Sequence, residues 1–210
     1  MKAEKTIQIK PIVLNTVTVV IEGDSDIILN KINASNRRTL IEKQKGSSTT
    51  IKEKNPWEDV ITAIHWRDGE PTEFTEKSMK EALKRNAPCI TSFGLKKTFE
   101  EAITRNKLEK HSTRFRNSVN VNATGGLIPI KFADHYIDEK LISPRRGAAP
   151  VLTRHNRFTG WRAEFTIQYV DGCYTLDQII QIVGLAGFGG GIGSGRSSGY
   201  GRFHVVEVRG

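Results

Sequence analysis

Residues 161–208 read WRAEFTIQYVDGCYTLDQIIQIVGLAGFGGGIGSGRSSGYGRFHVVEV and carry the clearest structural signals of the chain. Apolar and polar residues alternate from Trp161 to Tyr169, which indicates a strand with one buried face. Thr175 stands three residues before Gln178, as in a capping box, and opens an amphipathic helix that we expect to end near residues 184–187. A second strand is predicted over 201–208.

This order of strand, helix, glycine-rich loop and strand predicts two parallel strands joined by a right-handed crossover. At the front of the chain, residues 16–21 form a β-branched strand pattern, and Ser35 is a candidate N-cap for a helix with Leu40 and Ile41 as its apolar contacts. The simplest closure of these units is an α+β fold with a ferredoxin-like or RNA-recognition-motif-like sheet. We expect one domain over 1–210, with large insertions at about 45–160.

The middle of the chain is less clear. Residues 45–56 are polar and suggest a loop, and the period over 57–67 does not decide between helix and strand. Short helices are predicted over 76–85 and 95–108, with a short strand over 88–92 between them.

Composition points to a globular protein with an anionic partner. The 210 residues are 37% hydrophobic and 26% charged, with a formal net charge of +9. Such a charge favours nucleic acid over a membrane surface as a partner, although a basic protein need not have a polyanionic partner. Lysines interrupt the N-terminal stretch where a signal peptide would need apolar residues, so a cytoplasmic location is expected. Cys89 and Cys173 lack metal-ligand spacing, and no metal or cofactor is predicted.

The segment 143–160 is strongly basic and lacks Asp and Glu. Its two prolines exclude a regular helix, so we expect an irregular loop that projects into solvent or onto a phosphate backbone. Its arginines are Arg145, Arg146, Arg154 and Arg157. Further cations, Arg114 and Arg116, follow the helix predicted over 95–108.

The segment 187–203, GFGGGIGSGRSSGYGRF, holds eight glycines in seventeen positions. A phosphate-binding loop of the P-loop or Rossmann type is disfavoured, because those glycines follow a strand and precede a helix. Apolar residues at Ile192, Tyr200 and Phe203 argue against a flexible linker. Glycine at this density indicates a loop that another backbone or a ligand approaches closely.

The pattern Gly191-Ile192-Gly193, five residues with Arg196 among them, then Gly199-Tyr200-Gly201 and a strand resembles the C-terminal glycine-rich loop of the RAMP superfamily of CRISPR-associated proteins. The segment 21–29 is also similar to proteins carried by phages and mobile elements. The family resemblance implies a ferredoxin-like domain that binds single-stranded RNA or DNA. It further implies head-to-tail assembly along the strand, with segment 143–160 as a thumb-like element.

On this resemblance, Arg196 and Arg202 contact phosphate and Tyr200 either stacks on a base or lies in the core. The expected nucleic-acid-binding residues are Gly191, Gly193, Arg196, Gly199, Tyr200, Gly201, Arg202, Arg145, Arg146, Arg154, His155, Arg157, Arg114 and Arg116. The expected partner is single-stranded nucleic acid, RNA favoured, bound by a homo-oligomer or by a subunit of a ribonucleoprotein complex.

Members of this superfamily that cut RNA use either a histidine without metal or an aspartate with metal. The candidates here are His155 for proton transfer and Asp24 with Asp26 for a metal-dependent reaction. No histidine follows the first strand, where the family usually has one, because the first histidine after it is His65. We therefore predict a non-catalytic binder. The alternatives are a RAMP-type endoribonuclease and an interaction protein that inhibits a CRISPR complex.

Overall fold

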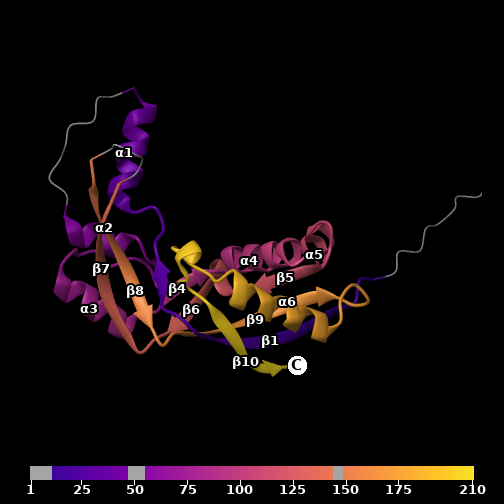
Figure 1. Ribbon diagram of the computed structural model, residues 1–210. Coiled ribbons are helices and arrows are strands. Elements are labelled where there is room, and N and C mark those ends of the chain that lie inside the picture. The colour runs from indigo at the N-terminus through magenta and orange to yellow at the C-terminus, as the bar shows by residue number, and fades with distance from the viewer. Residues whose placement is uncertain (1–10, 47–54, 144–148) are drawn as a thin grey trace, which may run out of the picture.

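The computed structural model describes residues 11–46, 55–143 and 149–210, which form a mixed α+β structure with two antiparallel sheets (Figure 1). The larger sheet has seven strands in the order β10-β1-β9-β6-β4-β3, and β5 also pairs with β9. Its strands are β1 (Leu14–Gly23), β3 (His65–Trp66), β4 (Pro88–Thr91), β5 (Val119–Asn122), β6 (Leu127–Lys131), β9 (Arg162–Val170) and β10 (Phe203–Arg209). The smaller sheet has the order β2-β8-β7, with β2 (Ile27–Leu29), β7 (Asp134–Ile142) and β8 (Val151–Thr159).

Six α-helices and two 3-10 turns lie in the described part of the chain. They are α1 (Ala34–Gln44), α2 (Pro56–Thr62), α3 (Glu76–Arg85), α4 (Ser92–Arg105), α5 (Thr113–Ser118), α6 (Leu176–Gly189), η1 (Thr124–Gly126) and η2 (Arg196–Ser198). None of the helices found in these residues is long and apolar enough to cross a membrane.

β1 is central to the larger sheet, because it pairs antiparallel with both β9 and β10. β9 and β10 are therefore parallel to each other, as the sequence predicted. The capping box that begins α6 is also confirmed, since the Thr175 hydroxyl accepts from the Gln178 backbone N–H at 3.2 Å. The helix continues to Gly189, beyond the predicted end. Burial of Val183 and Ala186 offsets the helix cost of glycine, which is about 1 kcal/mol per residue.

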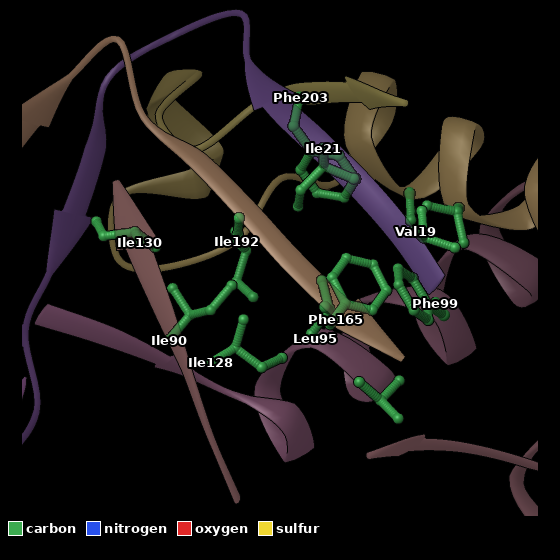
Figure 2. Close-up of a cluster of buried hydrophobic side chains, with 14 of the residues drawn as sticks. Val19, Ile21, Ile90, Leu95, Phe99, Ile128, Ile130, Phe165, Ile192 and Phe203 are labelled. Carbon is green, nitrogen blue, oxygen red and sulfur yellow. The ribbon is translucent and has the colours of Figure 1, made fainter. Parts of the chain in front are cut away.

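The main core lies between the larger sheet and the helices α4 and α6, which cover one of its faces (Figure 1). Figure 2 shows side chains from the two layers meeting, including Val19 and Phe165 from the sheet and Phe99 from α4. All are buried. The rings of Phe99 and Phe165 lie 6.1 Å apart between centroids. Ile192, from the glycine-rich loop, also enters this core.

The helix predicted after the first strand exists, but its details differ from the prediction. Asn33, not Ser35, is the N-cap of α1, and its side chain accepts from the Asn36 backbone N–H at 2.9 Å. Leu40 and Ile41, which were expected to be apolar contacts, are 51% and 42% exposed. The reason is that α1 contacts α2 through other groups, including an Arg38–Glu58 ion pair at 2.8 Å.

The predictions for the middle of the chain are mostly confirmed. α3 has the predicted bounds, and β4 lies within the predicted strand. α4 begins at Ser92, three residues earlier than predicted, because the Thr91 hydroxyl accepts from the Gly94 N–H and caps the helix there. The undecided stretch 57–67 is largely α2 followed by β3. Most of the predicted polar loop 45–56 lies outside the described residues.

The prediction of an irregular loop over 143–160 is wrong for its second half. Residues 151–159 form β8, the middle strand of the smaller sheet. The two prolines exclude a helix, as expected, but both precede β8 and leave its backbone N–H groups free to pair. Arg145 and Arg146 lie outside the described residues.

A pair of phenylalanines on α4 tests the core. Phe99 is 0% exposed and Phe93 is 79% exposed. Because Phe99→Ala leaves a cavity in the core, we expect it to lower the free energy of unfolding by about 3–5 kcal/mol. Phe93→Ala should change it by less than about 0.5 kcal/mol. Urea unfolding followed by circular dichroism measures both, and equal losses would contradict this packing.

Candidate nucleic-acid interface

The glycine-rich loop between α6 and β10 closes on itself and on the segment that follows β1. The Ile192 N–H donates to the Gly201 carbonyl at 2.9 Å. The Gly201 N–H then donates to Asp26 and the Ser194 N–H to Ile28, at 2.8 and 2.9 Å. These bonds attach the loop to the chain between β1 and β2.

Some glycines of the loop are buried, and others are exposed to solvent. Gly191 and Gly201 are buried, whereas Gly193 and Gly195 are exposed. At Gly201, φ is +70° and a Cβ would lie 1.8 Å from the Ile192 carbonyl oxygen, so the fold itself requires glycine here. The backbone N–H groups of Ile192 and Gly201 donate within the protein, so they are not available to a phosphate group.

Where the loop meets the β7–β8 hairpin, aromatic and basic side chains gather in what we call the Tyr–Arg cluster: Tyr136, Lys140, Arg157 and Tyr200. The Arg157 guanidinium lies 4.7 Å from the centre of the Tyr200 ring and 5.2 Å from that of Tyr136. The Lys140 Nζ is 3.2 Å from the Tyr200 hydroxyl. The cluster thus joins Tyr200 and Arg157, two residues predicted from the sequence, across 43 positions of chain.

Carboxylates neutralise the cations of the hairpin. Arg157 donates through Nε to Asp26 at 2.8 Å, and its NH1 lies 3.5 Å from Asp138. Arg154 pairs with Glu139 at 2.5 Å. The expectation that the arginines of this segment lack neutralising acids is therefore wrong for Arg154 and Arg157. The antiparallel register places Glu139 directly opposite Arg154, so Asp138 and Glu139 come from the neighbouring strand β7, whereas Asp26 comes from the turn between β1 and β2.

Hydrogen bonding between Lys140 and Asp138 shifts both groups toward their charged forms. It lowers the pKa of Asp138 and raises the pKa of Lys140, and the Lys140–Asp138 distance is 2.9 Å. Both groups are therefore ionised at neutral pH. A nucleic acid that binds at the cluster would therefore have to compete with the ion pairs that these charged groups already form.

The three candidate catalytic residues do not converge on one site. His155 lies opposite Asp138 on the hairpin, its Nδ1 is buried without a hydrogen-bond partner, and burial lowers its pKa. Asp24 accepts from His204 at 2.6 Å, whereas Asp26 pairs with Arg157. Within residues 11–46, 55–143 and 149–210, no group of three His, Cys, Asp or Glu side chains could hold a metal ion.

The remaining predicted arginines are spread over the molecule. Arg196 pairs with Glu101 of α4 at 3.0 Å, and Arg202 donates to the Phe188 carbonyl at 2.8 Å. Arg114 and Arg116 lie on α5, toward the opposite end of α4 from the glycine-rich loop (Figure 1). Arg116 pairs with Glu100 at 2.9 Å, and Arg114 lies 4.8 Å from the centre of the Tyr174 ring. The structure does not bring these two arginines into the Tyr–Arg cluster.

The strands β1, β5, β9 and β10, all within the described residues, expose no Phe, Tyr or Trp ring, and the exposed His204 imidazole of β10 is paired with Asp24. Among the described residues, the aromatic side chains of β1, β5, β9 and β10 all point into the core, as Phe165 and Phe203 do. The outer face of the sheet, turned away from α4 and α6, instead carries ion pairs, such as Arg162–Glu207 at 3.4 Å and Arg209–Glu164 at 2.7 Å. Exposed Tyr and Phe rings therefore lie elsewhere, as Tyr136 does where the hairpin meets the glycine-rich loop.

Comparison with known proteins gives a limited result. No protein-family model matches the chain, and no curated protein matches it. Among solved structures, 41 chains match. One belongs to a structure described as "Cryo-EM structure of the Type III-B Cmr-beta bound to cognate target RNA", with a TM-score of 0.47 and 14% identity. The match covers 93% of this chain but spans only 60% of that one. Similarity at this level does not define a function.

Sequence reasoning missed Tyr136 and Lys140. Both lie on β7, in a stretch that mixes acids, bases and apolar residues without a strong period. A sequence-level signal was present in Asp138 and Glu139, whose charges are opposite to those of the arginines downstream. Predicting which acid pairs with which arginine requires the register of the hairpin, which the sequence alone does not determine.

Two glycines of the loop test its closure. We expect Gly201→Ala to lower the free energy of unfolding by more than about 2 kcal/mol, because its Cβ would collide with the Ile192 carbonyl at a positive φ. Gly199 has a φ of +87°, but a Cβ there would meet nothing within 4 Å. Gly199→Ala should therefore cost only about 1 kcal/mol. Urea denaturation compares them, and a larger loss for Gly199→Ala would refute the described packing.

Proposed function

We propose that this protein binds single-stranded nucleic acid, RNA in preference, as a RAMP-like subunit that assembles along the strand. The observation that carries the proposal is the Tyr–Arg cluster, where the glycine-rich loop and the hairpin place two tyrosine rings 4.7 and 5.2 Å from one guanidinium. Proteins that bind single strands with little sequence preference combine cations for the phosphates with rings for the bases.

The arrangement of the central elements supports a ferredoxin-like domain. In chain order, β1, α4, β5, β9, α6 and β10 alternate as β-α-β-β-α-β, and the four strands lie in the order β10-β1-β9-β5 with each neighbouring pair antiparallel. This order is the one expected of a ferredoxin-like sheet and supports the proposal. Most other elements then lie in two insertions, one between β1 and α4 and one between β5 and β9, while α5 lies between α4 and β5 and η2 between α6 and β10.

The cluster offers both kinds of contact that a single strand needs. Tyr136 is 39% exposed, so its ring is accessible to a base. The Arg157 side chain is 24% exposed, and a phosphate group can replace its partner Asp26, whose side chain is 25% exposed, while Asp138 keeps its pair with Lys140. Because these contacts read neither base edges nor a duplex groove, the preference for sequence should be slight.

The β7–β8 hairpin is the proposed thumb. Figure 1 shows that it extends away from the layer formed by α4, α6 and the larger sheet. Apolar side chains near its described end are exposed, with Leu141 at 71%, Val151 at 53% and Leu152 at 46%. A second copy bound next along the strand would cover these side chains, which explains their exposure on an otherwise polar hairpin.

The decisive test is fluorescence anisotropy with a labelled 40-nucleotide RNA at several salt concentrations. We expect log Kd to rise with log salt by roughly 0.7 for each phosphate contacted. Tyr136→Ala should weaken binding about tenfold, because loss of one stacking ring costs about 1–3 kcal/mol. Arg209→Gln is the control variant. Like Arg157, Arg209 is paired with carboxylates, but it lies on the outer sheet face and should not affect binding.

Parallel measurements separate this proposal from its alternatives. The number of protein copies bound should grow with strand length in mass photometry, and the RNA should be recovered intact. Cleavage that survives EDTA would instead support an endoribonuclease that uses His155, and cleavage that EDTA abolishes would point to Asp24 and Asp26. Absence of RNA binding at low salt would favour the interaction-protein alternative.

A further inference from the structure

A cavity of about 280 Å³ lies against the glycine-rich loop, and no residue of the Tyr–Arg cluster lines it. Loop residues 192–196 form one wall, the end of β2 a second, and β4 with the first turns of α4 a third. Its inner surface is apolar, with Ile28, Ile90 and Ile192 at 4%, 3% and 5% exposed. The volume lies near the lower end for small-molecule sites, so it suits one compact ligand.

The cavity lining carries positive charge without negative charge. Lys31, Lys97 and Arg196 contribute to it, and its residues include no Asp or Glu. Each cation has a carboxylate partner outside the lining: Lys31 bonds to Glu70, Lys97 lies 3.7 Å from Glu100, and Arg196 lies 3.0 Å from Glu101. These pairs fix three cations around the opening, where an anionic group would meet them together.

An exposed ring stands at the same opening. Phe93 is 79% exposed, the highest value among the large apolar side chains of the described residues, and it also lines the cavity. Its neighbour on α4, Phe99, is fully buried, so the exposure is not a general feature of the helix. A flat aromatic ring beside an apolar hollow is suited to cover the face of a planar heterocycle.

His65 and Cys89, which also line the cavity, are uncharged at neutral pH. Burial raises the pKa of the Cys89 thiol to about 11, and burial together with the charge of Lys31 lowers the pKa of His65. These two residues face each other as a cross-strand pair between β3 and β4. A neutral imidazole can both donate and accept a hydrogen bond, which matches the polar edge of a nucleobase.

We propose that this cavity binds a single nucleotide, with the base in the apolar hollow against Phe93 and the phosphate held by Lys31, Lys97 and Arg196. The ligand is a nucleoside monophosphate, either free or as the phosphorylated terminal residue of a strand. This inference rests on the proposed function and deepens it, because a terminal nucleotide in the cavity would place one end of the strand at the glycine-rich loop.

Isothermal titration calorimetry tests the site with four nucleoside monophosphates, the matching nucleosides and inorganic phosphate. We expect at least one monophosphate to bind about tenfold more tightly than its nucleoside or than phosphate, because base and phosphate contacts add. Phe93→Ala and Lys97→Gln should each weaken it about tenfold. Phe188→Ala, which removes a ring that is 74% exposed and outside the cavity, is the control. Equal affinity for phosphate and monophosphates, or no binding, would overturn the proposal.

A second arm identifies the source of the nucleotide and separates this proposal from the previous one. RNA strands with a 5′-phosphate, a 3′-phosphate or neither are compared by anisotropy. If the ligand is a strand end, one phosphorylated form should bind several-fold more tightly, and Phe93→Ala should remove only that difference. If it is free nucleotide, the three strands should bind alike while calorimetry still shows monophosphate binding. Tyr136→Ala should weaken all three strands equally, so strand binding can survive when the cavity proposal fails.

Discussion

The hydrogen bonds between the glycine-rich loop and residues 25–28 are the constraint on which the rest of the structure depends. The loop belongs to the last quarter of the chain and residues 25–28 to the first, yet Gly201 bonds to Asp26, Ser194 to Ile28, and the Arg202 N–H to the Ser25 hydroxyl. These bonds fix the position of Tyr200 against the hairpin and of Ile192 in the core. Both candidate sites use this junction, the cluster through Tyr200 and the cavity through Ile28, Ile192 and Ser194.

The parts of the fold that the sequence predicted are those with local signals. The alternation after Trp161, the capping box at Thr175 and the helical period of α3 depend on neighbouring residues, and the structure agrees with each of them. The segment 151–159 was read as irregular because its polar composition hides a strand that is paired on both edges. Local pattern cannot show that pairing, since β2 and β7 lie elsewhere in the chain.

The sequence also predicted only part of the candidate site. Tyr200, Arg157 and Arg196 were singled out from the sequence by glycine spacing and charge, and the structure places all three beside the glycine-rich loop or the hairpin it contacts. Their carboxylate partners were not foreseen, because Asp26, Glu101 and Asp138 become neighbours only through tertiary contacts. The net charge of the chain therefore overstates the unpaired positive charge that these arginines offer. Phe93 was not predicted as a site residue, because its exposure depends on the fold.

The end of the larger sheet at β10 has a consequence for how copies of this protein can associate. Among the described residues, β10 has a neighbour only on the β1 side, and its register with β1 shifts between Val20 and Ile21. An open edge would invite another chain to add a strand, but the shift distorts the ladder, and charged Glu207 and Arg209 lie along it. Continuous sheets running from one molecule to the next are thereby discouraged. If copies of this chain associate, the contact between them can then be reversible and need not involve amyloid-like strand pairing.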